Sequence, residues 1–194
     1  MPWYRRHGKA ATPITFEEFL RAMERAKSIK PEHRAFAALL YYTGVRRGEA
    51  LRAVKEQFWV KDGFLFFDVG KRLKGGRETP PLNIPLNAPY VLDIWRVVKK
   101  TGKGERVFPF TDRTAYNIIC RVFNTYPHHL RLSRITDFLM KGFNIAEVKS
   151  WTGHASTKSL DSYVGIVDVH RMGESLIGKP TNKIMKLKQN RNEK

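Results

Sequence analysis

A run of β-type residues interrupts an otherwise helical pattern early in this 194-residue chain. In EQFWVKDGFLFFDVGKRLKGGRETPPLNIPL (56–86), apolar and aromatic runs are separated by Asp62-Gly63 and by a basic segment around Gly75-Gly76. Such dipeptides favour tight reversals between antiparallel strands. The stretch therefore predicts a three-stranded antiparallel meander, and any fold for this chain has to place it among helices.

Helical patterns lie on both sides of the meander. Thr15 and Glu18 form a capping box at the start of the first helix, whose apolar stripe is expected to be Phe16, Phe19, Leu20 and Met23. A second helix runs from Pro31 to about Gly44. A short helix follows in RRGEALRAV. Apolar periodicity then predicts helices in APYVLDIWRVVKK, DRTAYNIICRVFN, LRLSRITDFLMKGF and IAEVKSW, and a last one that carries Tyr163. The predicted fold class is mainly α with a small antiparallel β-sheet, that is, α+β.

The two ends of the chain differ in composition from its middle. We expect residues 1–12 to be a basic linker or N-terminal extension, 13–178 to form one domain, and 179–194 to be a flexible basic tail. The longest apolar run is too short to cross a bilayer, and the N-terminus lacks the apolar core of a signal peptide. The single cysteine, Cys120, excludes an internal disulfide. These features predict a protein of the cytoplasm without membrane partners.

The charge balance points to a polyanionic partner. The chain has 36 Lys and Arg against 18 Asp and Glu, a formal net charge of +18. Such a field attracts nucleic acid. A merely solvated cationic surface, or a ribosomal-type protein with charged arms, is the alternative. The basic residues run through the predicted fold, as in GVRRGEALR, GKRLKGGR and HHLRLSR, and this favours nucleic acid.

Metal-dependent hydrolysis of nucleic acid is not favoured by the pattern of acids. Two-metal sites need clustered carboxylates, and here the acids are scattered. Asp137 with Glu147-Val148-Lys149 faintly resembles a nuclease arrangement, but both pieces lie in helical pattern. No glycine-rich phosphate loop, HExxH pattern or nucleophilic-serine elbow is present. We therefore expect no metal site and no cofactor.

What remains is a set of cations and a tyrosine. Arg46 and Arg47 follow a glycine break at the start of a helix, where free N–H groups and the dipole favour phosphate. His128 precedes Arg131 by three residues, a spacing that puts both on one helix face. His154 stands nine residues before Tyr163. Taken singly, each has an ordinary explanation as a surface cation, a backbone contact or a core aromatic.

Taken together and in this order, these residues resemble the catalytic domain of the tyrosine recombinases, the phage integrase family. The family's T-G-x-R-x-x-E box is matched by Thr43–Glu49, and its H-x-L-R box by His128–Arg131. Its G-H pair, followed nine residues later by the nucleophile, is matched by Gly153, His154 and Tyr163. Each box alone is weak, whereas three boxes in order around a β-insertion are strong.

The resemblance implies a role for each matched residue. Arg46 and Arg131 would bind the non-bridging oxygens of the scissile phosphate, which suits the planar, always charged guanidinium. His128 and His154 would assist the phosphate and the proton movements, with His128 favoured as the base. Tyr163 would attack phosphorus to form a 3′-phosphotyrosyl link and expel a 5′-hydroxyl.

The resemblance further implies a catalytic lysine in the meander, and two lysines compete for this role. Lys74 is preferred over Lys71 because it precedes the glycine pair at the expected hairpin tip. Glu49 would orient an arginine or a histidine. Leu132 departs from the family, which often has a histidine there. The residues expected to contact DNA are Arg47 (alternatively an ion-pair partner), Lys71, Arg72, Arg77, His129 and Arg134.

The function that the resemblance implies is that of a site-specific DNA recombinase or integrase. It would act on double-stranded DNA as a dimer or tetramer, without metal or ATP. Two alternatives stay open: a type IB topoisomerase-like enzyme that relaxes one duplex, and a non-enzymatic basic DNA- or RNA-binding domain. Family members usually carry a separate N-terminal DNA-clamping domain, so we expect either an isolated catalytic fragment or a minimal recombinase.

Overall fold

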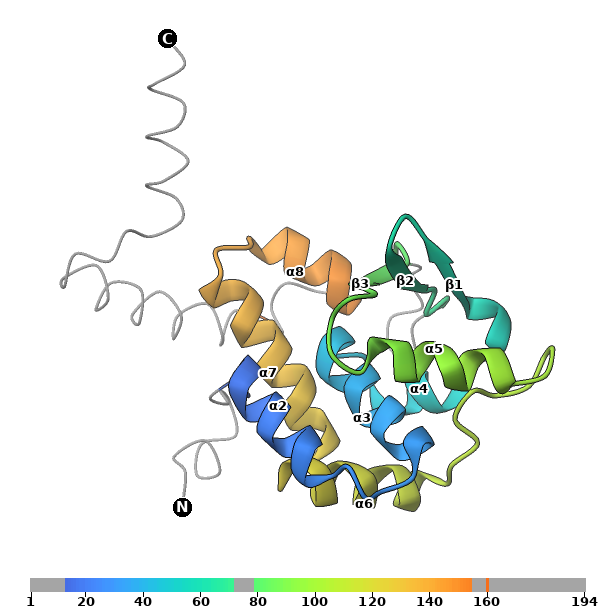
Figure 1. Cartoon of the computed structure of the whole chain (residues 1–194). Coiled ribbons are helices and arrows are strands. Elements are labelled where there is room, and N and C mark those ends of the chain that lie inside the picture. Colours follow the sequence, from blue (N-terminus) through green and yellow to red (C-terminus); the bar gives the residue numbers. More distant parts are fainter. Residues whose placement is uncertain (1–12, 72–78, 155–159, 161–194) are drawn as a thin grey trace, which may run out of the picture.

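The computed structural model describes residues 13–71, 79–154 and 160 (Figure 1). Its helices are α2 (Phe16–Arg25), α3 (Pro31–Thr43), α4 (Arg47–Arg52), the 3₁₀ turn η1 (Lys55–Gln57), α5 (Val91–Lys100), α6 (Asp112–Phe123), α7 (Pro127–Met140) and α8 (Ile145–Thr152). Its strands are β1 (Phe58–Lys61), β2 (Phe64–Phe67) and β3 (Leu82–Pro85). The predicted α+β class, mainly helical with one small antiparallel sheet, is confirmed.

Helix α3 is the central helix of the domain. Every side chain from Ala35 to Tyr41 is buried, as expected for a helix that is apolar all round. In Figure 1, α3 lies between α5 and α7, with α6 below it, and its closest packing partners are α5 and α7. Pro31 opens the helix at its first turn, and Gly44 ends it in the left-handed conformation with φ of 62°. Both ends agree with the sequence-based expectation.

The sheet has the predicted meander topology, with strand order β1-β2-β3 and both pairs antiparallel. Asp62 and Gly63 connect β1 and β2 with φ of 48° and 77°, the signs that a two-residue type I′ turn requires. One face of the sheet contributes Leu65, Phe67 and other side chains to the core.

The opposite side carries exposed aromatic residues. Trp59 of β1 stacks on its cross-strand neighbour Phe66, with ring centroids 5.4 Å apart and an interplanar angle of 3°. Trp59 is 36% exposed. We call Trp59 and Phe66, with Lys61 and Phe64 beside them, the outer sheet face.

Helices α2 and α7 agree with the sequence-based expectation except in the exposure of Phe16 and in the start of α7. The capping box of α2 is present, since Thr15 Oγ1 accepts from the Glu18 amide at 3.1 Å and Glu18 Oε2 accepts from the Thr15 amide at 2.8 Å. Phe16, expected in the apolar stripe, is 50% exposed. Helix α7 begins at Pro127 rather than at Leu130, because proline is well accommodated in the first helical turn. The earlier start places His128 and His129 inside the helix.

The C-terminal part of the described chain folds back onto α7. A separate small cluster of buried residues joins Ile135 and Leu139 of α7 to Val148 of α8 and to Leu160. The predicted helix that carries Tyr163 lies outside the described residues. Within 13–71, 79–154 and 160, no helix has the length and apolar character needed to cross a membrane.

Candidate active site

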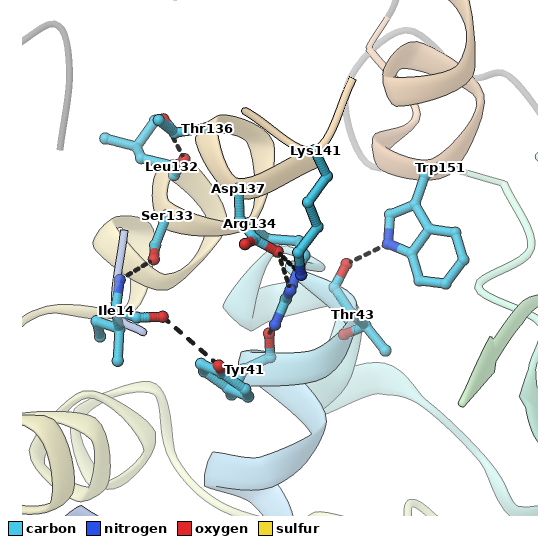
Figure 2. A network of polar contacts seen from close by, with 10 residues as sticks. All are labelled: Ile14, Tyr41, Thr43, Leu132, Ser133, Arg134, Thr136, Asp137, Lys141 and Trp151. Atoms are coloured by element: carbon cyan, nitrogen blue, oxygen red, sulfur yellow. Dashed lines mark hydrogen bonds and ion pairs between the residues drawn. The ribbon is translucent and has the colours of Figure 1, made fainter. Parts of the chain in front are cut away.

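Side chains from α7 and α8 bind the backbone at the C-terminal end of α3 (Figure 2). Arg134 donates from Nε and Nη2 to the Tyr41 carbonyl at 3.1 and 2.8 Å. The indole Nε1 of Trp151 donates to the Thr43 carbonyl at 2.8 Å. The last carbonyls of a helix lack partners within it and form the negative end of its dipole, so a cation is well matched to this place.

Arg131 completes this arrangement from the middle of α7. Its side chain is among the most buried in the protein, with 2% of the residue exposed. Nη1 donates to the Gly44 carbonyl at 3.0 Å, and Nη2 donates to the Thr152 carbonyl at 2.7 Å. Gly44 and Thr152 lie 87 and 21 residues from Arg131 in sequence. A single guanidinium of the second box therefore joins the first box to the residue directly before the third box.

We call this region the α3 junction: Tyr41, Thr43 and Gly44, with Arg131, Arg134, Trp151 and Thr152. Its close packing depends on glycine at position 44. A Cβ there would lie 2.9 Å from Cβ of Arg134 and 3.7 Å from Cα of Arg131. The backbone is also left-handed, which L side chains rarely adopt. The glycine of the first box thus has a structural reason.

Arg46 stands at the start of α4, two residues beyond Gly44. Its Nη1 donates to Glu49 Oε1 at 2.9 Å, and its backbone N–H donates to Glu49 Oε2 at 2.9 Å. The Glu49 side chain is 1% exposed, whereas that of Arg46 is 22% exposed. Glu49 therefore holds Arg46 from the buried side and leaves part of the guanidinium facing outward. The predicted orienting role of Glu49 agrees with this geometry.

His154 lies beside Arg131. Its Nε2 is 3.3 Å and its Nδ1 is 3.5 Å from Arg131 Nη2. The Nδ1 atom also lies 2.6 Å from Oγ1 of Thr152. The ring is half-buried. A histidine and an arginine from two different sequence boxes are therefore in direct contact, and the histidine is the more exposed of the two.

The two histidines at the start of α7 have different surroundings. His128 is exposed. His129 is 5% exposed, and its Nδ1 lies 2.6 Å from Thr125 Oγ1. The buried position of His129 argues against the DNA contact expected from the sequence, because its ring is turned into the protein.

Arg134 was also expected to contact DNA, and its position argues against this role. Besides the Tyr41 carbonyl, it binds Asp137 through Nη1 at 2.7 Å. Its guanidinium lies over the rings of Tyr41 and Phe138, at 4.8 and 5.5 Å. Lys141 binds the same oxygen of Asp137 at 2.9 Å (Figure 2). With a side chain 11% exposed, Arg134 has the contacts of a structural residue.

Arg47 is held on the other side of α4. It forms an ion pair with Asp112 and lies over the ring of Tyr116 at 5.8 Å. Its side chain is 28% exposed and that of Asp112 is 68% exposed. Of the two readings left open by the sequence, the ion-pair partner is the one seen in this structure.

The remaining predicted site residues lie at or beyond the edge of the described chain. Lys71 is exposed at the end of the segment that follows β2. Arg72, Lys74, Arg77 and Tyr163 lie outside the described residues.

Three tyrosines of the described chain are poorly suited to act as a nucleophile. Burial raises the pKa of Tyr42, whose hydroxyl donates to the Pro89 carbonyl at 3.0 Å. Burial also raises the pKa of Tyr41, against an opposing effect of Arg134. A hydrogen bond with Cys120 raises the pKa of Tyr116. These phenols stay protonated at neutral pH.

A metal centre finds no support in the part of the chain that the structure describes, where no group of three or more His, Cys, Asp or Glu could hold an ion. The polar residues that are gathered are instead arginines and a histidine, which are suited to bind an anion such as a phosphodiester. Sequence reasoning missed two contributors, Trp151 and Thr152. Their position directly before Gly153-His154 was the only available signal.

The chain belongs to the phage integrase family, whose model matches residues 12–168. The family predicted from the three boxes is confirmed.

Two relatives illustrate the similarity. The TnP I resolvase of Bacillus thuringiensis is 33% identical over 138 residues, which cover 63% of this chain and 45% of that protein. The tyrosine recombinase XerA of Pyrococcus furiosus is 24% identical over 172 residues, covering 81% of this chain and 58% of the relative. The chain thus spans about half the length of these relatives.

Solved structures show the same fold at low sequence identity. The XerH site-specific recombinase bound to palindromic difH substrate has a TM-score of 0.68 and 20% identity, and the match covers 87% of this chain and 53% of that one. The catalytic domain of bacteriophage HP1 integrase has a TM-score of 0.58 and 19% identity, over 88% of this chain and 97% of the other. The fold is that of a tyrosine recombinase catalytic domain.

Proposed function

We propose that this chain is the catalytic domain of a site-specific DNA recombinase or integrase, which cuts and rejoins DNA strands through a 3′-phosphotyrosyl intermediate. The observation that carries the proposal is the position of Arg131. It joins the Gly44 carbonyl of the first box to the Thr152 carbonyl and His154 of the third. Residues that are far apart in sequence thereby form one anion-binding site.

In the proposed reaction, Arg46 and Arg131 bind the two non-bridging oxygens of the scissile phosphate. Arg46 is partly exposed and oriented by Glu49. Arg131 is held by rigid backbone acceptors, so little reorganisation is needed when negative charge develops on the phosphate. His154 approaches the same phosphate through its contact with Arg131 and assists the proton movements there.

Tyr163 supplies the nucleophile. Its phenolic oxygen forms a bond to phosphorus, and the bond from phosphorus to the 5′-oxygen breaks. His128, exposed at the start of α7, takes the phenolic proton, and a lysine of the meander gives a proton to the leaving 5′-oxygen. Rejoining reverses these steps with a 5′-hydroxyl as the attacking group, so neither a metal nor ATP is required.

The proposed partner is double-stranded DNA, bound by self-associated copies of the chain in the cytoplasm. The net charge of +18 supports a polyanion as partner. Among the structural neighbours, XerH is bound to difH DNA and a lambda integrase tetramer is bound to a Holliday junction. The proposed DNA contacts are Lys71, Arg72 and Arg77.

A covalent trapping experiment tests the proposal. The protein is incubated with a library of nicked duplexes of random sequence. Cleavage near the nick releases a short fragment that carries the 5′-hydroxyl, so the strand cannot be rejoined and the covalent adduct accumulates. We expect wild type to form a DNA adduct that survives a denaturing gel, and Tyr163→Phe to bind the same DNA without forming it. Binding without any adduct in the wild type would leave the non-enzymatic alternative. Sequencing the trapped DNA identifies the target.

A second experiment asks which lysine protonates the leaving 5′-oxygen, and it uses the target DNA sequence identified by trapping. Replacing the 5′-bridging oxygen by sulfur makes the leaving group good enough to depart without a proton. We propose Lys74 as the acid, so Lys74→Ala should cleave the oxygen substrate slowly and the sulfur substrate at the wild-type rate. Lys71→Ala is the matched control, and the reverse pattern would assign the role to Lys71.

The outcome of the reaction separates recombination from relaxation. We expect exchange between two target-bearing duplexes, with steep dependence of binding on salt, because about 6–10 phosphate contacts imply a loss of roughly 10³–10⁵-fold in affinity between 50 and 200 mM salt. Relaxation of a supercoiled plasmid without a second site would favour the topoisomerase-like alternative.

A further inference from the structure

Thr152 touches both Arg131 and His154, although no box of the family resemblance includes it. Its carbonyl accepts from Arg131 Nη2 at 2.7 Å, and its hydroxyl oxygen lies 2.6 Å from Nδ1 of His154. The residue is 1% exposed, so neither contact competes with bulk water. Its hydroxyl is therefore placed to control the imidazole.

The proton of the Thr152 hydroxyl is engaged in a hydrogen bond within α8. Oγ1 donates it to the Val148 carbonyl at 2.7 Å, which can only accept. The contact between Oγ1 and His154 Nδ1 then needs its proton from the ring. The hydroxyl thus assigns a proton to Nδ1.

The contact with Arg131 is compatible with this assignment. Nη2 of a guanidinium carries two hydrogens and accepts none. One hydrogen goes to the Thr152 carbonyl at 2.7 Å, and a ring nitrogen can interact with Nη2 only through a lone pair. With the proton on Nδ1, the nitrogen with a lone pair is Nε2, which is also the nearer of the two to Nη2, at 3.3 Å against 3.5 Å. The neutral ring is the Nδ1–H form with its lone pair on Nε2.

We propose that Thr152 is a positioning residue that keeps a proton on Nδ1 of His154, so that Nε2 is the only ring nitrogen that exchanges a proton at the phosphate site. The hydroxyl accepts from Nδ1–H whether Nε2 is protonated or not, so the ring keeps its orientation through the reaction. The link to cleavage rests on the proposed function, whereas the assignment of the tautomer stands on the contacts alone.

Substitutions at position 152 separate the hydroxyl from the backbone. Thr152→Val removes the hydroxyl and keeps the carbonyl that binds Arg131, and Thr152→Ala is a second such variant should valine disturb packing. Thr152→Ser restores the hydroxyl. Thr136→Val is the matched control, because Thr136 is 5% exposed and its Oγ1 donates to the Leu132 carbonyl at 3.0 Å (Figure 2). It makes the same bond back along a helix and lies outside the site.

Two readouts decide the proposal. In ¹⁵N spectra of the histidine rings, with His154 assigned by loss of its signal in His154→Gln, we expect the Nδ1–H form in wild type, Thr152→Ser and Thr136→Val. Thr152→Val and Thr152→Ala should shift the ring toward Nε2–H. Adduct formation on the trapped target DNA should slow by about 10–100-fold in these two variants with DNA affinity unchanged, the scale typical for partners that orient a functional histidine.

Three results would overturn the proposal. The first is a wild-type His154 ring protonated on Nε2, and the second is a ring that stays protonated on Nδ1 in both variants that lack the hydroxyl. The third is a ring whose proton moves to Nε2 in these variants while the rate of adduct formation stays the same. Failure of the proposed function has a different signature. The wild type would then form no adduct at all, and the ring spectra would still decide whether Thr152 sets the tautomer.

Discussion

The α3 junction and the outer sheet face use opposite means to hold their parts together. At the junction, buried and partly buried hydrogen bonds join residues 87, 93 and 108 positions apart, at the end of α3, in α7 and in α8. On the outer sheet face, Trp59 and Phe66 are neighbours on adjacent strands and stay partly open to solvent. Arg131 and Arg134 are thus held by contacts between distant segments, whereas the outer sheet face depends on pairing between adjacent strands.

This difference predicts where a substitution affects stability and chemistry together. A change at the junction breaks contacts between distant segments, so it should alter both the free energy of unfolding and the proposed cleavage. A change on the outer sheet face should alter local stability alone. Three experiments test the contrast, and a fourth measures a contribution at the start of α3.

The largest effect is expected at Arg131. Arg131→Met should lower the free energy of unfolding by at least about 2 kcal/mol, because two buried carbonyls lose donors at a typical cost of about 1–3 kcal/mol each. Arg131→Lys should slow adduct formation by about 10²–10³-fold, the usual effect of removing one preorganised donor. Urea denaturation and the trapping assay measure the two quantities. Arg96→Lys, at a side chain 66% exposed, is the control, and equal effects at both positions would refute the contrast.

A glycine pair gives the next comparison, with Gly44 in the α3 junction and Gly63 in the turn that joins β1 to β2. Gly44 and Gly63 both have positive φ, 62° and 77°, so alanine strains the backbone at either place by about 1–3 kcal/mol. Only at Gly44 does the new Cβ also meet Cβ of Arg134 at 2.9 Å, whereas nothing lies within 4 Å at Gly63. Gly44→Ala should therefore cost about 1–3 kcal/mol more than Gly63→Ala because of overpacking. Similar urea midpoints for the two variants would contradict this expectation and would show that Arg134 can move to make room for the new Cβ.

On the outer sheet face the effect should be small and local. A double-mutant cycle with Trp59→Thr and Phe66→Thr should give a coupling of about 0.5–1.5 kcal/mol in the free energy of unfolding, the range for a stacked aromatic pair. Adduct formation by Trp59→Thr should match the wild type. A loss of cleavage comparable to that of Arg131→Lys would mean that this face takes part in the chemistry.

The smallest effect concerns the start of α3, far from the junction at its end. His33 packs edge-on against Phe110, with centroids 5.1 Å apart. Burial, and then Lys30, lower the pKa of His33 below 6.5. The unfolded chain therefore binds the proton more readily, and stability should fall as pH drops below 6.5 toward the lower folded pKa. The difference in urea midpoint between pH 7.5 and pH 5.5 should be smaller in His33→Gln than in wild type. An equal difference in the two proteins would show that His33 does not contribute to the pH dependence of stability.

Local signals in the sequence predicted most of the fold. Thr15 with Glu18, Pro31 with Gly44 and the Asp62-Gly63 turn each act over a few residues, and each lies in the structure where its pattern placed it. Phe16 was misjudged because its periodic position says nothing about whether another element covers it. The start of α7 was misjudged because Pro127 was not counted as a first-turn residue.

The candidate site also has features that the sequence predicts and features that only the tertiary structure decides. The three boxes, their order and the family they identify depend on residue types and spacing, which can be read from the sequence. Whether an arginine faces a ligand or the interior depends on which backbone carbonyls lie near it. Arg131 and Arg134 are three residues apart on one helix, and both turn to the end of α3, yet only Arg131 also reaches His154.

Residue chemistry along the chain thus established a helical domain with an inserted meander, a strongly basic surface and the arginine, histidine and tyrosine boxes of the phage integrase family. Folding in three dimensions established the contacts that no spacing encodes: Glu49 beneath Arg46, His129 turned to Thr125, Arg47 paired with Asp112, and Thr152 between Arg131 and His154. The physical reason is that buried polar groups must find partners, and those partners come from whichever segments the packed helices bring within about 3 Å of each other.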